Sequence, residues 1–142
     1  AARIMAASQA GQYNLPRMLR RCDFVACDIC RARFIEAVLS TVFLINRKYV
    51  PFYKWAFRAV KQLPLMGMSI AEKLEHLVSL PLMETMPEAV AEPVEGICQE
   101  IADHLQSEGL LDSNDPWLFA QGPVIQAHIE NNALRSMPPQ LE

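Results

Sequence analysis

The sequence predicts an all-α protein, a single helical-bundle domain of about six or seven helices over residues 1–135, with a loose tail over residues 136–142. Three observations favour this fold class. The 142 residues include only five glycines, whereas residues of high helix propensity such as Ala, Leu, Met and Glu are frequent. Apolar side chains recur at helical spacing, and no segment alternates as a half-buried strand does. The ten prolines are then expected to separate the helices rather than to lie inside them.

The first two predicted helices are short. Residues 2–10 form the first, which ends at Gly11 because glycine is a poor helix former. Asn14 is the expected N-cap of the second helix, and Pro16 is tolerated in its first turn.

The longest predicted helix opens at Asp23 or Asp28 and reaches about residue 46. Its apolar residues cover a broad face, so we expect it to be central in the bundle. Pro51 disfavours helix at the residue before it but suits the start of a new helix, which runs to about residue 63.

Caps and prolines divide the second half of the chain. Ser69 and Glu72 form a capping box that starts a helix, and Pro81 ends that helix. Pro87 and Pro93 then bracket an irregular or short helical stretch. The next helix begins at Pro93 and ends near Gly109, which is a suitable C-cap.

Two further helices complete the prediction. The pair Asp115–Pro116 opens a short helix, and the pair Gly122–Pro123 breaks it. Residues 124–134 form the last helix.

The first residue is Ala, and residues 1–10 resemble a helix from within a protein. They lack the charged start and long apolar middle of a signal peptide, so we expect a fragment or processed piece with sequence missing before it. The longest strongly apolar run, residues 37–45, is far shorter than the roughly 20 residues that cross a bilayer. We therefore expect no membrane partner and a cytoplasmic location.

Charge is distributed unevenly along the chain. The net charge is −3, but residues 1–71 hold eleven Arg and Lys against three acids, whereas residues 72–142 hold two against thirteen. No acid lies between Glu36 and Glu72. Either the halves neutralise each other where they pack, or the excess forms a positive field suited to phosphate or an acidic partner. The pI of about 5.6 argues against a nucleic-acid partner.

The four cysteines are interpreted as free thiols. Cys22, Cys27, Cys30 and the distant Cys98 match a plant-type iron–sulfur spacing only nominally. The residues between the first three include no glycine and lead directly into a helix, whereas such a cluster is normally wrapped by loop backbone. We expect buried thiols of a cytosolic protein instead.

No motif for catalysis is present. The chain has no Gly-rich phosphate loop, no nucleophile elbow and no Glu-x-x-His pair of the di-iron type. His76 and His104 each follow a glutamate by four residues, a spacing that is more typical of solvated helix pairs than of metal sites. We therefore expect no catalytic residue, no metal site and no cofactor in this chain.

The most distinctive segment follows the longest predicted helix and interleaves cations with aromatic rings. Lys54 and Arg58 share one face of the helix expected there. Such cations can hold phosphates while an aromatic ring stacks on a base. The alternative is that Phe52, Trp55 and Phe57 belong to the core and that the cationic groups reach water past them.

Short motifs follow one another in a recognisable order over residues 5–66: Gly11-Gln-Tyr-Asn14, Arg17, Arg21-x-Asp23, Arg33-Phe34, Leu44-x-Asn46, Tyr49-x-Pro51-x-Tyr-Lys-Trp55 and Leu63-Pro64. They resemble a bacterial family of unknown function in which a helical C-terminal domain follows a nucleotidyltransferase-like domain. The basic half, residues 1–66, carries the resemblance. The acidic half, residues 67–135, resembles the family only loosely.

This resemblance implies a helical-bundle domain similar to the substrate-binding helical domains of kanamycin-type nucleotidyltransferases. In that superfamily a Gly-Ser motif and metal-binding carboxylates lie on an N-terminal α/β domain. This chain has no Gly-Ser pair and no Asp-x-Asp, so the resemblance implies that domain as a partner and no catalysis by the chain alone. It implies Mg²⁺ as a cofactor of a parent metal-dependent nucleotidyltransferase, and a nucleotide or small molecule as its substrate.

The candidate nucleotide- or substrate-binding residues combine the motif positions with the neighbouring cations. They are Asn14, Arg17, Arg21, Asn46, Arg47, Tyr49, Tyr53, Lys54 and Arg58, and Trp55 lies at a motif position beside them. In this interpretation the helical domain contributes positioning and positive charge. The alternative is a non-enzymatic protein-interaction or oligomerisation module whose charged faces dock a partner.

Overall fold

A computed structural model describes residues 1–139, and no strand occurs among them, so the all-α prediction is confirmed. Of the predicted tail over residues 136–142, the last three residues lie outside the described part of the chain. The elements in chain order are α1 (Ala2–Ala7), the π-helix η1 (Ser8–Asn14), α2 (Leu15–Arg20), α3 (Phe24–Ile45), α4 (Tyr53–Val60), α5 (Gly67–Ser79), α6 (Pro87–Ser107), α7 (Leu118–Ala127) and α8 (Asn132–Arg135).

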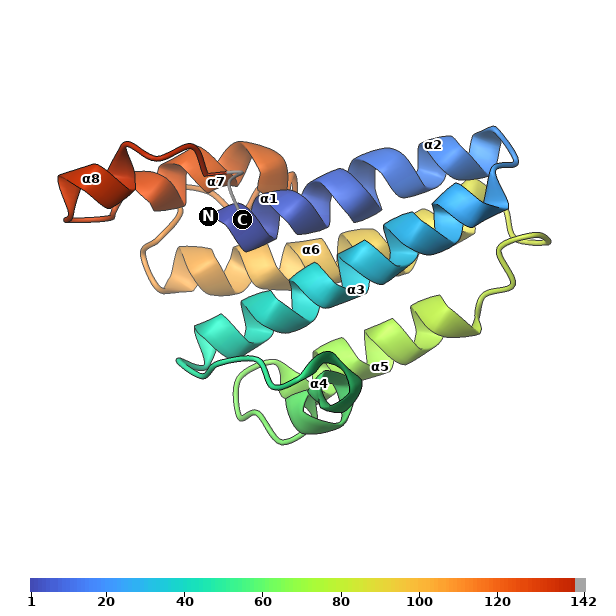
Figure 1. The fold of residues 1–142 in the computed structure, drawn as a ribbon, viewed down its shortest axis with the longest axis horizontal. Coiled ribbons are helices and arrows are strands. Elements are labelled where there is room, and N and C mark those ends of the chain that lie inside the picture. The colour runs from blue at the N-terminus through green and yellow to red at the C-terminus, as the bar shows by residue number, and fades with distance from the viewer. Residues whose placement is uncertain (140–142) are drawn as a thin grey trace.

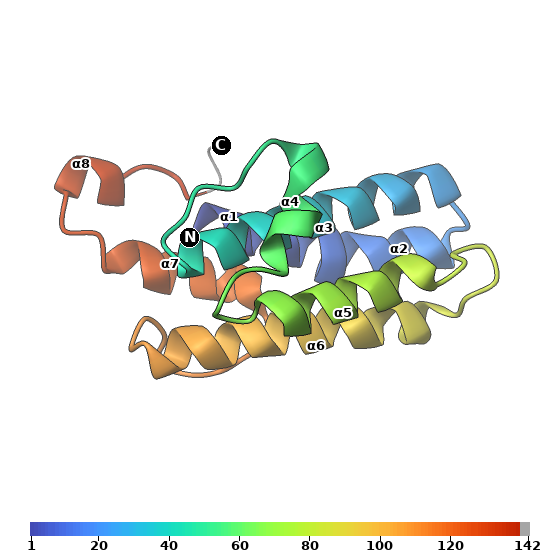
Figure 2. The same ribbon diagram turned by 90° about the horizontal axis from the view of Figure 1, so that it is seen from below.

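The long helices run roughly along one axis, and α4 lies across them (Figures 1 and 2). α3 packs against α1, η1 and α2 and, near its other end, against α4, while α5 packs against α6 and α7 against α1. Within residues 1–139 no helix combines the length and the apolar character that a bilayer crossing requires.

α1, η1 and α2 form one continuous helical rod, so the predicted break at Gly11 is wrong. In η1 the turn widens, and the Leu15 N–H donates to the carbonyl of Ala10, five residues back. This wide turn directly precedes Pro16, whose ring would clash with the carbonyl four residues earlier in a regular α-helix. Asn14 therefore lies inside the rod, and its side chain caps nothing.

Gly11 allows the rod to lie directly against α3. A Cβ built at this residue would be 2.3 Å from the ring of Phe34, and Phe34 is fully buried. A glycine inside a helix costs about 1 kcal/mol relative to alanine. The burial of the Phe34 ring against bare backbone offsets that cost, which is why the helix continues.

α3 is central, as predicted, and Asp23 is its N-cap. The Asp23 carboxylate accepts a hydrogen bond from the Ala26 N–H at 3.1 Å. One face of the helix is completely buried, with Phe34, Val38 and Val42 inaccessible to solvent.

The predicted capping box at Ser69 is wrong. α5 begins two residues earlier, at Gly67, after Met66 adopts a left-handed φ of 63°. A Cβ at Gly67 would be 2.3 Å from the carbonyl oxygen of Val60, so glycine lets α5 start against the end of α4. Ser69 instead donates its hydroxyl hydrogen to Glu100 on α6, at 2.8 Å. The end of α5 just before Pro81 agrees with the prediction.

Two predicted boundaries are wrong because packing overrides the local signal. α6 begins at Pro87 rather than Pro93 and runs through Pro93, which is buried near Val90. α7 runs through the pair Gly122–Pro123 to Ala127, and glycine lets this helix lie directly against Met5 of α1, since a Cβ at Gly122 would be 2.2 Å from the Met5 sulfur. In both places burial of the helix face compensates for the N–H that proline lacks. The predicted last helix over residues 124–134 is wrong as well, because its residues are divided between α7 and the separate α8.

Gln12 joins the rod to the second half of the chain. Its amide nitrogen donates to the Glu95 carboxylate at 2.7 Å and to the Pro116 carbonyl at 2.9 Å. Its amide oxygen accepts from the Leu118 N–H, at the start of α7, at 3.3 Å. One side chain thus fixes η1, α6 and α7 relative to one another.

Candidate ligand-binding surfaces

The connection from α3 to α4, together with α4, forms a surface of exposed rings and cations. Tyr49 is 95% exposed, Tyr53 76%, Phe52 63% and Trp55 52%. Phe52 and Trp55 are therefore not core residues, whereas Phe57 is half-buried and packs against the core. We call this the aromatic–cationic surface, and it comprises Arg47, Lys48, Tyr49, Phe52, Tyr53, Lys54, Trp55 and Arg58.

The shape of α4 explains why these side chains remain in solvent. The helix is short, and its buried residues are Ala56 and Val60. Because these two small residues face the core at i,i+4, the other faces of the helix point outward. α4 also projects from the layer of α3 (Figure 2).

Lys54 lies among the rings of this surface. Its Nζ is 5.3 Å from the centre of the Trp55 ring and 5.9 Å from that of Phe52. The rings of Phe52 and Tyr53 are 4.6 Å apart between centres. Within residues 1–139 Lys54 has no ion pair with a carboxylate. A cation held beside exposed rings can contact a phosphate while a ring stacks on a planar group.

An apolar groove of about 610 Å³ adjoins this surface, between α3 and α4. Among the described residues that line it, only Glu36 is charged. Tyr53 belongs both to this groove and to the aromatic–cationic surface, so a ligand on the rings could extend into it. We call it the α3–α4 groove; its lining residues are Ala32, Ile35, Glu36, Leu39, Ser40, Val50, Pro51, Tyr53 and Ala56.

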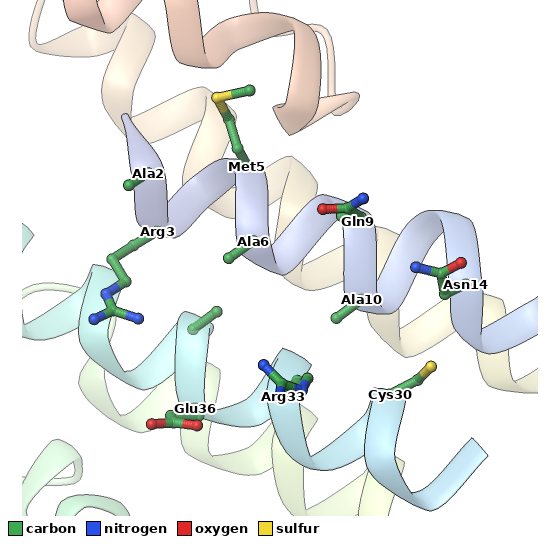
Figure 3. Close-up of a pocket in the computed structure, with 11 residues that line it drawn as sticks. Ala2, Arg3, Met5, Ala6, Gln9, Ala10, Asn14, Cys30, Arg33 and Glu36 are labelled. Carbon is green, nitrogen blue, oxygen red and sulfur yellow. The ribbon is translucent and has the colours of Figure 1, made fainter. Parts of the chain in front are cut away.

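A second groove, of about 450 Å³, lies between the rod and α3 (Figure 3). We call it the rod–α3 groove. Its polar lining residues are Arg3, Gln9, Asn14, Cys30, Arg33 and Glu36. Of the nine predicted site residues, Asn14 alone is among the described residues that line this groove.

The structure does not bring the two predicted basic segments together. Arg17 and Arg21 lie at the end of α2, beside the start of α3, whereas residues 46–58 follow the other end of α3 (Figure 1). The 22 residues of α3 span about 33 Å at 1.5 Å per residue. The nine predicted residues therefore cannot form one small-molecule site. Arg17 instead pairs with Tyr13, donating to its hydroxyl at 2.9 Å and lying over its ring.

Asn46, another of the predicted residues, uses both ends of its side-chain amide in hydrogen bonds to backbone. Its amide nitrogen donates to the carbonyls of Val42, at 2.8 Å, and Leu65, at 3.0 Å. Its amide oxygen accepts from the Leu65 N–H at 3.0 Å. Asn46 thus ties the end of α3 to the loop between α4 and α5.

Replacing Asn46 with alanine should lower the free energy of unfolding by about 1–2 kcal/mol, because three hydrogen bonds are lost. Asn46→Asp should lose at least as much, since its carboxylate keeps the bond from the Leu65 N–H but lies against the Val42 and Leu65 carbonyls, to which it cannot donate. Urea denaturation followed by circular dichroism measures both. Stability equal to that of the unchanged protein in both variants would show that these bonds contribute nothing and would return Asn46 to the ligand-contact candidates.

The charge asymmetry is only partly neutralised inside the molecule. Within residues 1–139, two ion pairs join the basic and acidic halves, Lys61–Glu75 and the longer Arg20–Glu88. Several cations of the basic half have no carboxylate partner among those residues: Arg17, Arg21, Arg33, Arg47, Lys48, Lys54 and Arg58.

All four cysteines are free thiols. Burial raises the pKa of Cys27, Cys30 and Cys98 above the usual value for a thiol, which keeps these groups protonated at neutral pH. Cys22 is exposed in the turn between α2 and α3. In the described part of the chain, no three His, Cys, Asp or Glu side chains come close enough together to hold a metal ion.

Both grooves are formed by the N-terminal part of the chain, since their lining residues lie between residues 2 and 56. Residues 1–56 match the family model described as a domain of unknown function, DUF4037. The matched segment covers the rod, α3 and the first half of α4 and overlaps the resemblance found over residues 5–66. No curated protein and no solved structure matches the chain. The chain thus contains a helical domain segment of unknown function, and the grooves are part of it.

Within the matched segment, sequence reasoning missed the residues that shape the rod–α3 groove. Arg33 belongs to the motif Arg33-Phe34, yet nothing in the motif indicates which helix faces it. A weak signal existed in the small side chains of Ala2, Ala6 and Ala10, whose i,i+4 spacing leaves room beside the rod.

Proposed function

We propose that this chain is a substrate-positioning domain of a nucleotidyltransferase-like protein and that it is not catalytic on its own. The observation that carries the proposal is the exposure of Tyr49, Tyr53 and Trp55 beside Lys54. Trp is highly buried on average, and contiguous exposed apolar patches commonly mark binding sites. In this proposal a nucleotide stacks its base on the rings and places its phosphates against Lys54 and Arg58.

The interaction energies available on such a surface are sufficient to hold a nucleotide in place. Stacking of a base on an aromatic side chain is worth about 1–3 kcal/mol, and each charge-assisted hydrogen bond to phosphate adds about 1.5–3 kcal/mol. Together they would hold a nucleotide while an N-terminal nucleotidyltransferase domain, the proposed partner, supplies the metal-binding carboxylates. Mg²⁺ bound there would neutralise the triphosphate during the transfer.

We further propose that the parent protein is bacterial and acts in the cytoplasm. The four free thiols support this part of the proposal, because a reducing compartment keeps cysteines unpaired.

A second candidate is a protein-interaction or oligomerisation module. The observation that favours it is the continuity of exposed Phe52 and Tyr53 with the apolar α3–α4 groove. Large exposed apolar patches commonly mark protein interfaces.

Intrinsic fluorescence tests the nucleotide proposal. The chain has two tryptophans, so a Trp117→Phe background leaves Trp55 as the sole reporter. ATP with Mg²⁺ should quench Trp55 saturably, whereas tripolyphosphate with Mg²⁺, which has no base to stack, should bind without comparable quenching. Lys54→Ala combined with Arg58→Ala should weaken ATP binding about tenfold or more, with little change in melting temperature. Arg20→Ala, exposed at the far end of α2, is the matched control.

Absence of quenching at millimolar ATP would contradict the nucleotide proposal. So would a double variant that binds ATP unchanged but melts much lower, since Lys54 and Arg58 would then be structural. Concentration-dependent association in sedimentation velocity, lost on Phe52→Ser, would favour the interaction module instead.

A further inference from the structure

We propose that the rod–α3 groove binds a small zwitterion, a molecule that carries an ammonium group and a carboxylate or phosphate. In this site Glu36 receives the ammonium and Arg33 the anionic group. The proposal does not depend on the nucleotide proposal, since it concerns a different groove and uses Arg33 and Glu36 instead of Lys54 and Arg58.

The first argument is that two opposite charges remain unpaired side by side. Arg33 and Glu36 are three residues apart on α3, a spacing at which such side chains commonly pair. The same helix shows this, because Asp28 and Arg31 pair at 2.7 Å with that spacing. Yet the side chains of Arg33 and Glu36 have neither an ion pair nor a hydrogen bond within residues 1–139. Both of them line the groove.

The second argument is the room between the helices. Figure 3 shows Ala6 and Ala10 of the rod pointing toward α3, opposite the segment that bears Cys30, Arg33 and Glu36. Because alanine side chains are short, the space between the rod and α3 stays open. Its volume of about 450 Å³ lies within the roughly 300–1,000 Å³ typical of small-molecule sites.

The third argument is selectivity. A simple anion that meets Arg33 also meets the negative charge of Glu36, and a simple cation that meets Glu36 also meets the positive charges of Arg33 and of Arg3, which lines the same groove. Only a ligand with both charges satisfies both side chains, and repulsion discriminates against the others. Gln9 and Asn14, on the rod side, add amide donors and acceptors for polar groups of the ligand.

A series of zwitterions with increasing distance between the ammonium and the carboxylate tests the site, with the complete chain as the protein sample. The probes are glycine, 3-aminopropanoate, 4-aminobutanoate and 6-aminohexanoate, together with 2-aminoethyl phosphate to separate phosphate from carboxylate. Butylamine and butanoate carry one charge each and serve as controls. Backbone amide shifts in NMR titrations report both affinity and location. We expect at least one zwitterion to shift residues around Ala6, Ala10, Arg33 and Glu36 saturably, and the two controls not to.

Arg33 and Glu36 are exposed, so replacing either side chain should change the stability of the fold little. Arg33→Gln and Glu36→Gln should each weaken the best zwitterion about tenfold or more, and the swap Arg33→Glu with Glu36→Arg should restore binding in the reversed orientation. Arg20→Gln should have no effect, and Lys54→Ala, which tests the nucleotide proposal, should leave the zwitterion bound.

Three results would overturn the proposal. One is the absence of saturable shifts with every zwitterion at millimolar concentration. Another is equal binding of butylamine or butanoate, which would mean that a single charge suffices. The third is unchanged zwitterion affinity in both Arg33→Gln and Glu36→Gln.

Discussion

Replacing Gly11 with alanine is expected to lower the free energy of unfolding by about 3 kcal/mol. The added Cβ would lie 2.3 Å from the Phe34 ring, so the rod and α3 must move apart or the ring must leave its rotamer. Overpacking of a well-packed core typically costs about 1–3 kcal/mol and occasionally more, and here it outweighs the higher helix propensity of alanine. Urea denaturation followed by circular dichroism measures the loss.

Gly96→Ala is the matched control for Gly11→Ala. Gly96 lies inside α6, and among residues 1–139 no atom beyond its chain neighbours and the backbone of α6 lies within 4 Å of a Cβ built there. This variant should gain about 0.5–1 kcal/mol, as helical glycines without steric conflict do. Phe34→Leu, which removes the clashing ring atoms, should make Gly11→Ala less costly than it is alone. Equal effects of the two glycine variants, or strict additivity with Phe34→Leu, would contradict the close contact.

Replacing Gln12 with alanine is expected to cost about 2–3 kcal/mol. Three hydrogen bonds are lost, to Glu95, Pro116 and Leu118, and two of them are partly buried, where unsatisfied groups are most costly. The expected loss also includes weaker docking of the start of α7, which hydrogen exchange at the Leu118 amide would report separately.

Gln9→Ala provides the control for Gln12→Ala. Gln9 has the same side chain on the same rod, but it is exposed and its side chain makes no hydrogen bond among residues 1–139. Its replacement should change the free energy of unfolding by less than about 0.5 kcal/mol. A similar loss in both variants would mean that helix propensity, rather than the contacts of Gln12, sets the cost.

Local rules predicted the fold where the deciding interaction is itself local. Asp23 caps α3, Pro81 ends α5 and Gly109 follows α6 with a positive φ, and each depends on neighbouring backbone. They failed at Gly11, Pro93 and the pair Gly122–Pro123, where contacts with residues far along the chain decide. A glycine or proline inside a helix is unfavourable on its own, but burial of its helix face compensates.

The same distinction applies to the candidate site. The aromatic–cationic segment was predicted because its residues are adjacent in sequence. Its exposure depends on which side of α4 faces the core. The sequence did not decide whether the aromatic residues belong to the core or contact a ligand. The rod–α3 groove was missed, because it forms from two helices that meet only in the fold. The unpaired state of Arg33 and Glu36 is likewise visible only in three dimensions.

Glu36 lines both grooves, and one carboxylate cannot serve two ligands in the same way at once. If both grooves are occupied, neutralising Glu36 from one side changes the electrostatic field on the other. Thermodynamic linkage then requires that each ligand alter the affinity of the other by the same factor. The Glu36 side chain on α3 would thus couple the ligand affinities of the two grooves without any movement of the helices.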